Sequence, residues 1–262
     1  MVVFAGQGDA RRSMALLWQQ EPENSLRPGP KQGLDVETIV RAAVEIADTD
    51  GIGALSMRAV GEKLGRTAMA LYTYVPSKSE LVDLMYDRTL AEQPTEYDLG
   101  PGWRAALTLR ANDTWDFYLR HPWVLQVSQA RPALGPNEWA TLETTLRIMV
   151  ATGLPPRSVR QLTGALYQFI RGVAQTLAEA TYAVRATGMS DEEWLSARSG
   201  MLAEVAPDFA ERYPTMAALS AADSSGPADA TVPYLQKSTT ETFRAGLAVF
   251  LDGIEQAIAQ PS

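Results

Sequence analysis

Basic residues gather in one short stretch of an acidic chain, between positions 56 and 79. They are Arg58, Lys63, Arg66 and Lys78. Glu62 is the only acidic residue there, so four cations against one anion leave a net charge of +3, whereas the whole chain has a formal net charge of −8. A local excess of positive charge is typical of a surface that binds nucleic acid phosphates. We therefore expect local DNA binding and no general affinity for polyanions.

Two short helices joined by a tight turn must position these charges. Ser56 is a good N-cap for the first helix, and Gly65 lies where that helix should end in a left-handed residue. Thr67 caps a second short helix, which must end before Pro76 because the residue before a proline is disfavoured in a helix. Ser77 then starts a third helix. The spacing predicts a helix-turn-helix, a unit that either reads DNA or serves as scaffold in a helical protein.

A longer pattern surrounds this unit, from Leu34 to about Leu90. Its apolar, small, aromatic and basic positions are Ile39, Ala43, Ala47, Gly51, Leu55, Ser56, Arg58, Leu64, Gly65, Leu71, Tyr72, Tyr74, Val75, Lys78, Leu81 and Leu84. With these residues the block resembles the DNA-binding domain of the TetR family of transcriptional regulators. The resemblance implies an all-α fold, in which a three-helix helix-turn-helix domain precedes a larger helical domain that binds an effector and dimerises. It also implies that effector binding weakens DNA binding.

The resemblance, carried over position by position, implies which residues meet DNA. The expected DNA contacts are Arg58, Thr67, Ala68, Met69, Tyr72, Thr73, Tyr74 and Lys78. We expect Arg58 to read guanine, because a guanidinium matches the two acceptors of that base. Lys78 and the two flanking residues Thr67 and Tyr74 are expected to contact phosphates. Small Ala68 favours contact with thymine methyl groups over hydrogen-bonded readout.

Residues 1–33 have prolines and glycines without sustained periodicity, and we expect a flexible N-terminal arm with at most one helical turn, around Met14 to Gln19. An alternative is that Arg27 and Lys31, just before the first helix, enter a minor groove. Met14 begins a run that could equally be the start of translation.

The expected domains are a DNA-binding domain with its linking helix at 34–92 and a helical effector and dimerisation domain at 101–262. Helices are expected at 102–120, 122–130, 137–152, 157–187, 191–204 and 239–259, several of them marked by an initial proline or a capping box. Residues 205–237 contain several prolines, so we expect a long mobile loop there.

The helices near 157–187 and 239–259 each carry a broad apolar stripe. Such a stripe either completes its own core or pairs with a second copy to form a four-helix interface. We favour a homodimer, because one short reading helix binds DNA weakly, whereas a twofold dimer presents two of them to successive major grooves about 34–36 Å apart.

Aromatic residues are concentrated after the domain boundary, and polar residues lie beside them on the long helix. The candidate ligand-binding residues are Trp103, Trp115, Tyr118, His121, Trp123, Trp139, Tyr167, Gln168, Arg171 and Gln175. Aromatic walls with a few polar groups suit a planar, mostly apolar ligand, although such residues often form plain core. We expect a repressor that such a ligand releases from its operator, controlling an efflux or antibiotic-response gene.

The chain has no cysteine and one histidine. Disulfides, thiolate metal sites and histidine clusters are therefore excluded, and acid–base catalysis at neutral pH is hard to build. We expect no enzymatic activity, no metal and no cofactor. An all-helical enzyme or a ligand-binding protein without DNA activity is the alternative. The lack of cysteine and of an apolar run of about 20 residues fits a cytoplasmic protein that makes no use of a membrane.

Overall fold

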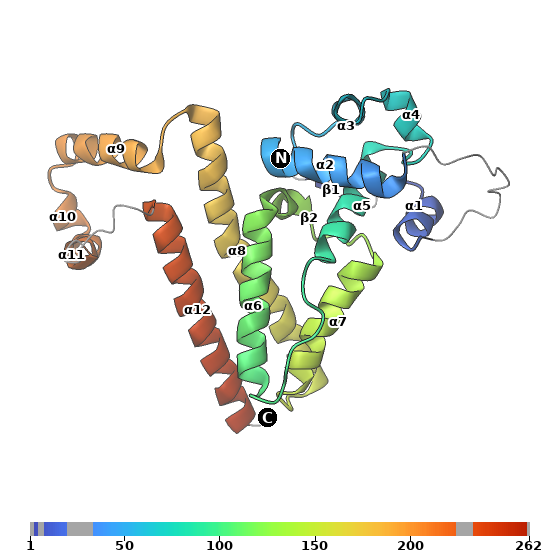
Figure 1. The fold of residues 1–262 in the computed structure, drawn as a ribbon. Helices are drawn as coiled ribbons and strands as arrows, with labels where there is room; N and C mark the ends of the chain where they lie inside the picture. The colour runs from blue at the N-terminus through green and yellow to red at the C-terminus, as the bar shows by residue number, and fades with distance from the viewer. Residues whose placement is uncertain (1–2, 5–7, 20–33, 224–232, 261–262) are drawn as a thin grey trace. The chain divides into compact units, whose positions relative to one another are not determined.

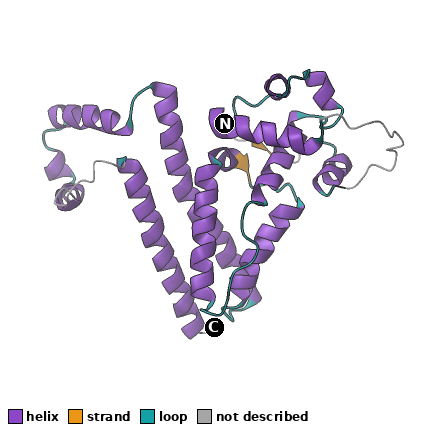
Figure 2. Ribbon diagram, viewed as in Figure 1, coloured by secondary structure: helices purple, strands orange, loops and turns teal. Residues whose placement is uncertain are grey.

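The computed structural model describes residues 3–4, 8–19, 34–223 and 233–260, which are almost entirely helical (Figure 1). One pair of two-residue strands is present in this part of the chain, β1 (Val3–Phe4) parallel to β2 (Val127–Ser128) (Figure 2). The expectation of an all-α fold is confirmed. None of the described helices is long and apolar enough to cross a membrane. The chain divides into two compact units, one of Met1–Gly172 with Leu247–Ser262 and one of Val173–Gly246.

Four helices of the first unit form the helix-turn-helix region. They are α2 (Val36–Asp50), α3 (Met57–Lys63), α4 (Ala68–Tyr72) and α5 (Lys78–Leu90). The predicted caps are present: the side chains of Ser56, Thr67 and Ser77 accept hydrogen bonds from backbone N–H groups of the helices they precede. Gly65 has a φ of +63°, the left-handed conformation expected at the turn. The sequence therefore contains the local signals that end and restart each of these helices.

The remainder of the first unit is built from long helices. They are α6 (Trp103–Arg120), α7 (Pro136–Val150), the first half of α8 (Pro156–Thr187) and the end of α12 (Tyr234–Ala259). The helix expected at 122–130 is wrong. The chain forms the short 3-10 helix η1 (Pro122–Gln126) and then strand β2, because Val127 turns to an extended conformation.

The described part of the N-terminal arm contains a short helix, α1 (Ala10–Leu17), which the side chain of Asp9 caps. The expected single turn around Met14 to Gln19 is therefore part of a longer helix that begins earlier, at Ala10. Leu17 is buried against the unit, with only 2% of its surface exposed, and the Trp18 indole donates a hydrogen bond to the carbonyl oxygen of Leu134 (3.1 Å). A short amphipathic helix therefore obtains its stability from packing, which local composition does not indicate.

The second unit contains the second half of α8, then α9 (Asp191–Val205), α10 (Phe209–Arg212), α11 (Pro214–Asp223) and the start of α12. A capping box of Ser190 and Glu193 begins α9. The long loop expected at 205–237 is wrong for its described part, which is mostly helical. Pro214 takes the first position of α11, where a missing N–H costs nothing, so this proline starts a helix.

Candidate DNA interface and its connection to the helical domain

The turn between α3 and α4 presents a row of side chains to solvent. Leu71 and Val75 are fully buried and fix α4 to the domain. The opposite side of α4 and its flanks is exposed, most of all at Met69 (75%). The other predicted contact residues on this surface are Thr67, Tyr72, Thr73 and Tyr74, which are exposed, and Ala68, which is half-buried. One surface therefore collects the residues of α4 that we expected to meet bases and phosphates.

The basic residues around this surface form at most weak, exposed ion pairs with the described residues. Arg58 Nε donates to Glu62 Oε1 at 2.8 Å, and Lys63 Nζ pairs with Glu45 Oε2 at 3.0 Å. Arg66 and Lys78 are exposed, and neither forms an ion pair with another residue that the structure describes. Exposed ion pairs are weak, so phosphates can replace these carboxylates at little cost. All four cations are thus available to DNA.

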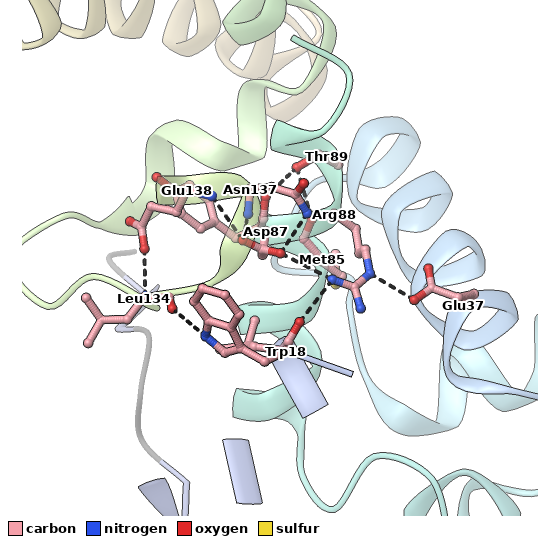
Figure 3. Close-up of polar contacts among 11 residues, drawn as sticks. Trp18, Glu37, Met85, Asp87, Arg88, Thr89, Leu134, Asn137 and Glu138 are labelled. Carbon is pink, nitrogen blue, oxygen red and sulfur yellow. Dashed lines mark hydrogen bonds and ion pairs between the residues drawn. The ribbon is translucent and has the colours of Figure 1, made fainter. Parts of the chain in front are cut away.

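Helix α5 leads from this surface to the helical domain, and Asp87 joins the two (Figure 3). The carboxylate is fully buried and accepts hydrogen bonds from the backbone N–H groups of Asn137 (2.9 Å) and Glu138 (3.1 Å) and from the Asn137 amide (2.8 Å). Gly135, the residue before α7, has no side chain to cap that helix. A residue of α5 therefore supplies the N-cap of α7 and places a negative charge where the helix dipole favours one.

Arg88, the next residue of α5, joins three further groups (Figure 3). Its Nε donates to Glu37 Oε1 of α2 at 2.8 Å, and its Nη1 donates to Asp87 Oδ2 at 3.2 Å and to the carbonyl oxygen of Leu17 at 3.4 Å. One guanidinium thus connects the first helix of the DNA-binding region, the linking helix and the end of α1. Its several donors in a fixed plane suit such a role.

A second connection lies at the junction of α6 and η1, where His121 is buried. Its ring contacts Asp48 of α2 and Glu92, just beyond α5. His121 was a candidate ligand-binding residue, and so was Trp123, whose indole N–H donates to Asp48 Oδ1 at 2.8 Å. The structure brings these two residues together at this junction, beside the DNA-binding region.

A buried arginine organises the interior of the helical domain. Arg110 of α6 is only 1% exposed. Its guanidinium donates to Gln93 Oε1 (2.8 Å), Thr145 Oγ1 (3.0 Å) and the Tyr167 hydroxyl (3.2 Å), which belong to the linking segment, α7 and α8. Neutral acceptors therefore hold this cation, because the described residues include no carboxylate within ion-pair distance of it.

Three of the candidate ligand-binding residues come close together in this domain. Burial raises the pKa of the Tyr118 hydroxyl, and the positive charge of Arg171 opposes that increase. Tyr167 adds to the increase, so Tyr167 and Arg171 of α8 both lie close enough to Tyr118 of α6 to affect its pKa. Arg171 Nη2 donates to the carbonyl oxygens of Leu125 and Val127.

The other candidates are distributed differently. Trp115 is buried, and Trp103 is half-buried at the start of α6. Trp139 is 48% exposed and Gln168 is also exposed, so neither encloses an interior site. Gln175 lies in the other compact unit and donates to Glu179 Oε1 at 2.8 Å.

Several of the residues that connect the parts were not among the sequence candidates, namely Asp48, Glu92, Asp87 and Arg110. One of them could have been found from the sequence. Arg110 falls on the apolar stripe that Ala106, Leu107 and Ala111 define, so a charge stands where a core residue belongs. The three carboxylates resemble ordinary surface residues. No group of acidic residues and histidine in the described part of the chain is arranged to hold a metal ion.

Two family models match this chain. The model described as "Bacterial regulatory proteins, tetR family" matches residues 39–85, and the model described as "Tetracyclin repressor-like, C-terminal domain" matches residues 97–258. The first contains the exposed turn and α4. The second contains the buried arginine and the candidate ligand-binding residues from Trp103 onward.

Individual relatives agree with these matches. The chain is 39% identical to the HTH-type transcriptional repressor DrrR1 of Streptomyces coeruleorubidus over 259 residues, which is 98% of this chain and 89% of the relative. It is 30% identical to the class D tetracycline repressor protein of Escherichia coli over 158 residues, 58% of this chain and 70% of the relative. Among solved structures, ActR of Streptomyces coelicolor in complex with actinorhodin has a TM-score of 0.67 and 22% identity, covering 87% of this chain and all of ActR. At that identity the similarity to ActR establishes the fold alone.

Proposed function

Because the chain belongs to the TetR family of transcriptional regulators, we propose that it is a repressor that binds an operator as a homodimer and leaves it when a small ligand binds. The observation that carries this proposal is the exposed side of α4, whose buried side is fixed by Leu71 and Val75. A basic surface of this kind has little use in a helical enzyme. The relative DrrR1 is named a transcriptional repressor, which supports repression rather than activation.

The DNA contacts that we propose are those of the exposed surface. Arg58 exchanges Glu62 for a guanine, and the side chains of Ala68, Met69, Tyr72 and Thr73 contact bases in the major groove. Thr67, Tyr74 and Lys78 contact phosphates. The arm residues Arg27 and Lys31 lie outside the described residues, and their entry into a minor groove is a separate proposal.

The proposed dimer uses α8 and α12, the helices near 157–187 and 239–259. The apolar stripe of α12 is largely buried within the chain, at Phe243, Leu247, Leu251 and Ile254. Support for the dimer comes from two apolar side chains of α12 that remain accessible, Val249 (71% exposed) and Ile258 (36% exposed). A second copy would cover them, and its own reading helix would double the DNA contacts.

The proposed effector is a planar, mostly apolar or aromatic compound that binds in the helical domain near Tyr118, Tyr167 and Arg171. Buried aromatic rings with a few polar groups support this chemistry. ActR and a TetR of Acinetobacter baumannii have been solved with actinorhodin and with minocycline. We propose that the regulated gene encodes an efflux or antibiotic-response protein.

Effector binding has a direct route to the DNA-binding region in this proposal. Asp87 links α5 to α7, so a ligand that moves α7 also moves α5 and changes the separation of the two reading helices. A coupling free energy of about 1–3 kcal/mol is sufficient for useful release.

A gel-shift assay with the DNA upstream of the protein's own coding region tests this function. We expect a retarded complex whose affinity falls steeply with salt, and release of the DNA by actinorhodin, minocycline or a related fused-ring compound. If the protein does not bind this DNA even at low ionic strength, the proposed role in transcriptional regulation is refuted. If every such compound increases the affinity for DNA, the proposed effect of the ligand on DNA binding has the wrong sign.

A further inference from the structure

His121 is the only histidine of the chain, and it lies between two carboxylates. Its Nδ1 is 2.8 Å from Asp48 Oδ1, and its Nε2 is 3.1 Å from Glu92 Oε2. Only 3% of His121 is exposed, whereas the side chains of Asp48 and Glu92 are 29% and 42% exposed. The ring is therefore held at both nitrogens by acidic side chains from different parts of the fold.

The hydrogen-bonding capacity of imidazole decides its charge here. A neutral imidazole has one N–H donor and one bare nitrogen, and an ionised carboxylate has acceptors only. A neutral His121 would therefore direct a lone pair at one of the two carboxylate oxygens. Only the imidazolium, with two N–H groups, satisfies both contacts.

The neighbouring donors keep the proton on the ring and away from the carboxylates. The Trp123 indole N–H donates to the same Asp48 oxygen, and Arg120 donates to the same Glu92 oxygen. Both oxygens are thus already acceptors of a second hydrogen bond. Burial alone would raise the pKa of Glu92, but the hydrogen bonds from His121 and Arg120 hold that pKa below its ordinary value.

The position of this cluster gives it a mechanical role. Asp48 lies in the last turn of α2, the first helix of the DNA-binding region, whereas His121 and Trp123 belong to the junction of α6 and η1. Glu92 follows the linking helix α5. The ring of Phe117 on α6 packs against the imidazole, with centroids 5.4 Å apart. One cation therefore connects the DNA-binding helices to the helical domain.

We propose that the His121 imidazolium is a positioning residue for DNA binding: it holds α2 against the end of α6, and operator affinity falls when the ring loses its proton. The charged groups around it are Asp48 on α2, Glu92 after α5 and Arg120 at the end of α6. With His121 protonated, two cations balance two anions. Without that proton, one ring nitrogen of the buried His121 presents a lone pair to a carboxylate oxygen, two partly exposed carboxylates face one arginine, and the junction loosens. This inference rests on the proposed DNA binding and adds a control by pH.

The direction of the pH effect follows from the partners. Burial by itself would lower the pKa of His121, but the hydrogen bonds and charges of Asp48 and Glu92 outweigh burial, and the pKa lies above the ordinary value of 6.5. A raised folded-state pKa contributes stability that is complete below the unfolded value and is lost as pH rises through the folded value. The junction is therefore most stable below pH 6.5 and weakens as the pH rises above that value through the folded-state pKa of His121.

The single histidine makes the first test unambiguous. The carbon-bound ring protons of the full chain, labelled at histidine, give one set of NMR signals, whose titration between pH 5 and about 10 reports only His121. We expect one transition above 6.5. The Asp48→Asn variant has nearly the same side-chain volume but no charge, so we expect it to move the transition down by about one unit. A wild-type midpoint at or below 6.5 overturns the inference.

The second test joins the titration to DNA binding, with the upstream fragment that the gel shift identifies. At constant ionic strength, we expect wild-type operator affinity to fall about tenfold as pH rises through the NMR midpoint, which corresponds to a bound-state pKa about one unit higher. The affinity of His121→Gln should be low and should lack this transition. The affinity transition of Asp48→Asn should move together with its NMR midpoint.

The outcomes separate this inference from the proposed function. If His121 titrates above 6.5 but wild type and His121→Gln share one pH profile of affinity, the residue is structural only and the positioning role is refuted, while DNA binding stands. If His121→Gln does not fold, the parallel displacement of both midpoints in Asp48→Asn still decides the matter. A displacement of the NMR midpoint without any change in the affinity profile refutes the coupling.

Discussion

Replacement of Asp87 by alanine removes the contact on which the start of α7 depends. The carboxylate is fully buried and accepts four hydrogen bonds, two from backbone N–H groups of α7, one from the side chain of Asn137 and one from Arg88. Gly135 lies so close that a Cβ at that position would overlap this carboxylate. No side chain of the 134–136 turn can therefore take over the cap.

The expected destabilisation is about 3 kcal/mol. Loss of an N-cap costs about 1 kcal/mol. A second buried donor left without an acceptor adds about 1–3 kcal/mol. The Asn137 amide contributes less, because its side chain is only half-buried and can turn to water. Asp87→Asn retains one acceptor oxygen and should lose roughly half as much.

The measurement is urea unfolding followed by far-UV circular dichroism, at one fixed protein concentration because the midpoint of an oligomer depends on it. Asp116, exposed on the same domain in α6, provides a matched control, and Asp116→Ala should change the free energy of unfolding by less than about 0.5 kcal/mol. The reasoning is refuted if Asp87→Ala loses less than about 1 kcal/mol, or if it loses no more than the control.

Further substitutions test the DNA surface and the core. Arg58→Ala should bind the operator roughly tenfold more weakly and lose specificity at one base pair. Lys78→Ala should weaken binding to all DNA sequences alike and reduce the slope of log affinity against log salt concentration by about 1. Fluorescence anisotropy with single-base variants of the operator distinguishes the two, and equal, sequence-independent losses would contradict the assignment. Gly61→Ala should destabilise the helix-turn-helix by about 2 kcal/mol, because its Cβ would lie 2.7 Å from the carbonyl oxygen of Arg66. Gly53→Ala, with open space around it, serves as the control, and similar thermal midpoints for the two would disprove the clash. Arg110→Ala should lose about 3 kcal/mol or more in urea unfolding, since three acceptors in three segments lose a buried donor, and a loss below about 1 kcal/mol would show that the network is dispensable.

Local signals in the sequence account for the DNA-binding region. Ser56, Thr67 and Ser77 cap helices whose N–H groups lie two or three residues away, so the sequence itself holds both partners of each contact. The same is true of Gly65 at the turn. The apolar period that buries Leu71 and Val75 also requires only neighbouring residues. The three caps and the turn at Gly65 were predicted, and the family resemblance identified the same segment.

Tertiary contacts determined the structure of the segments that contain proline, because a proline can either end a helix or begin one. Prolines between 205 and 237 suggested a loop, yet Pro214 begins α11, because a proline breaks a helix only after its first turn. Pro122 likewise begins a 3-10 helix, and the extended Val127 then pairs with Val3. Composition indicates that a helix ends or begins near a proline, and the tertiary partners determine which.

The sequence by itself determined the helical class, the reading unit and its positive charge, because these depend on residues a few positions apart. Only the tertiary structure decided which charges connect the DNA-binding helices to the rest. Asp87 meets Asn137 across 50 positions, and Asp48 meets His121 across 73. An aspartate in a helix has the same local pattern whether it faces water or a buried donor, so its partner becomes evident only when the packed chain brings the two together.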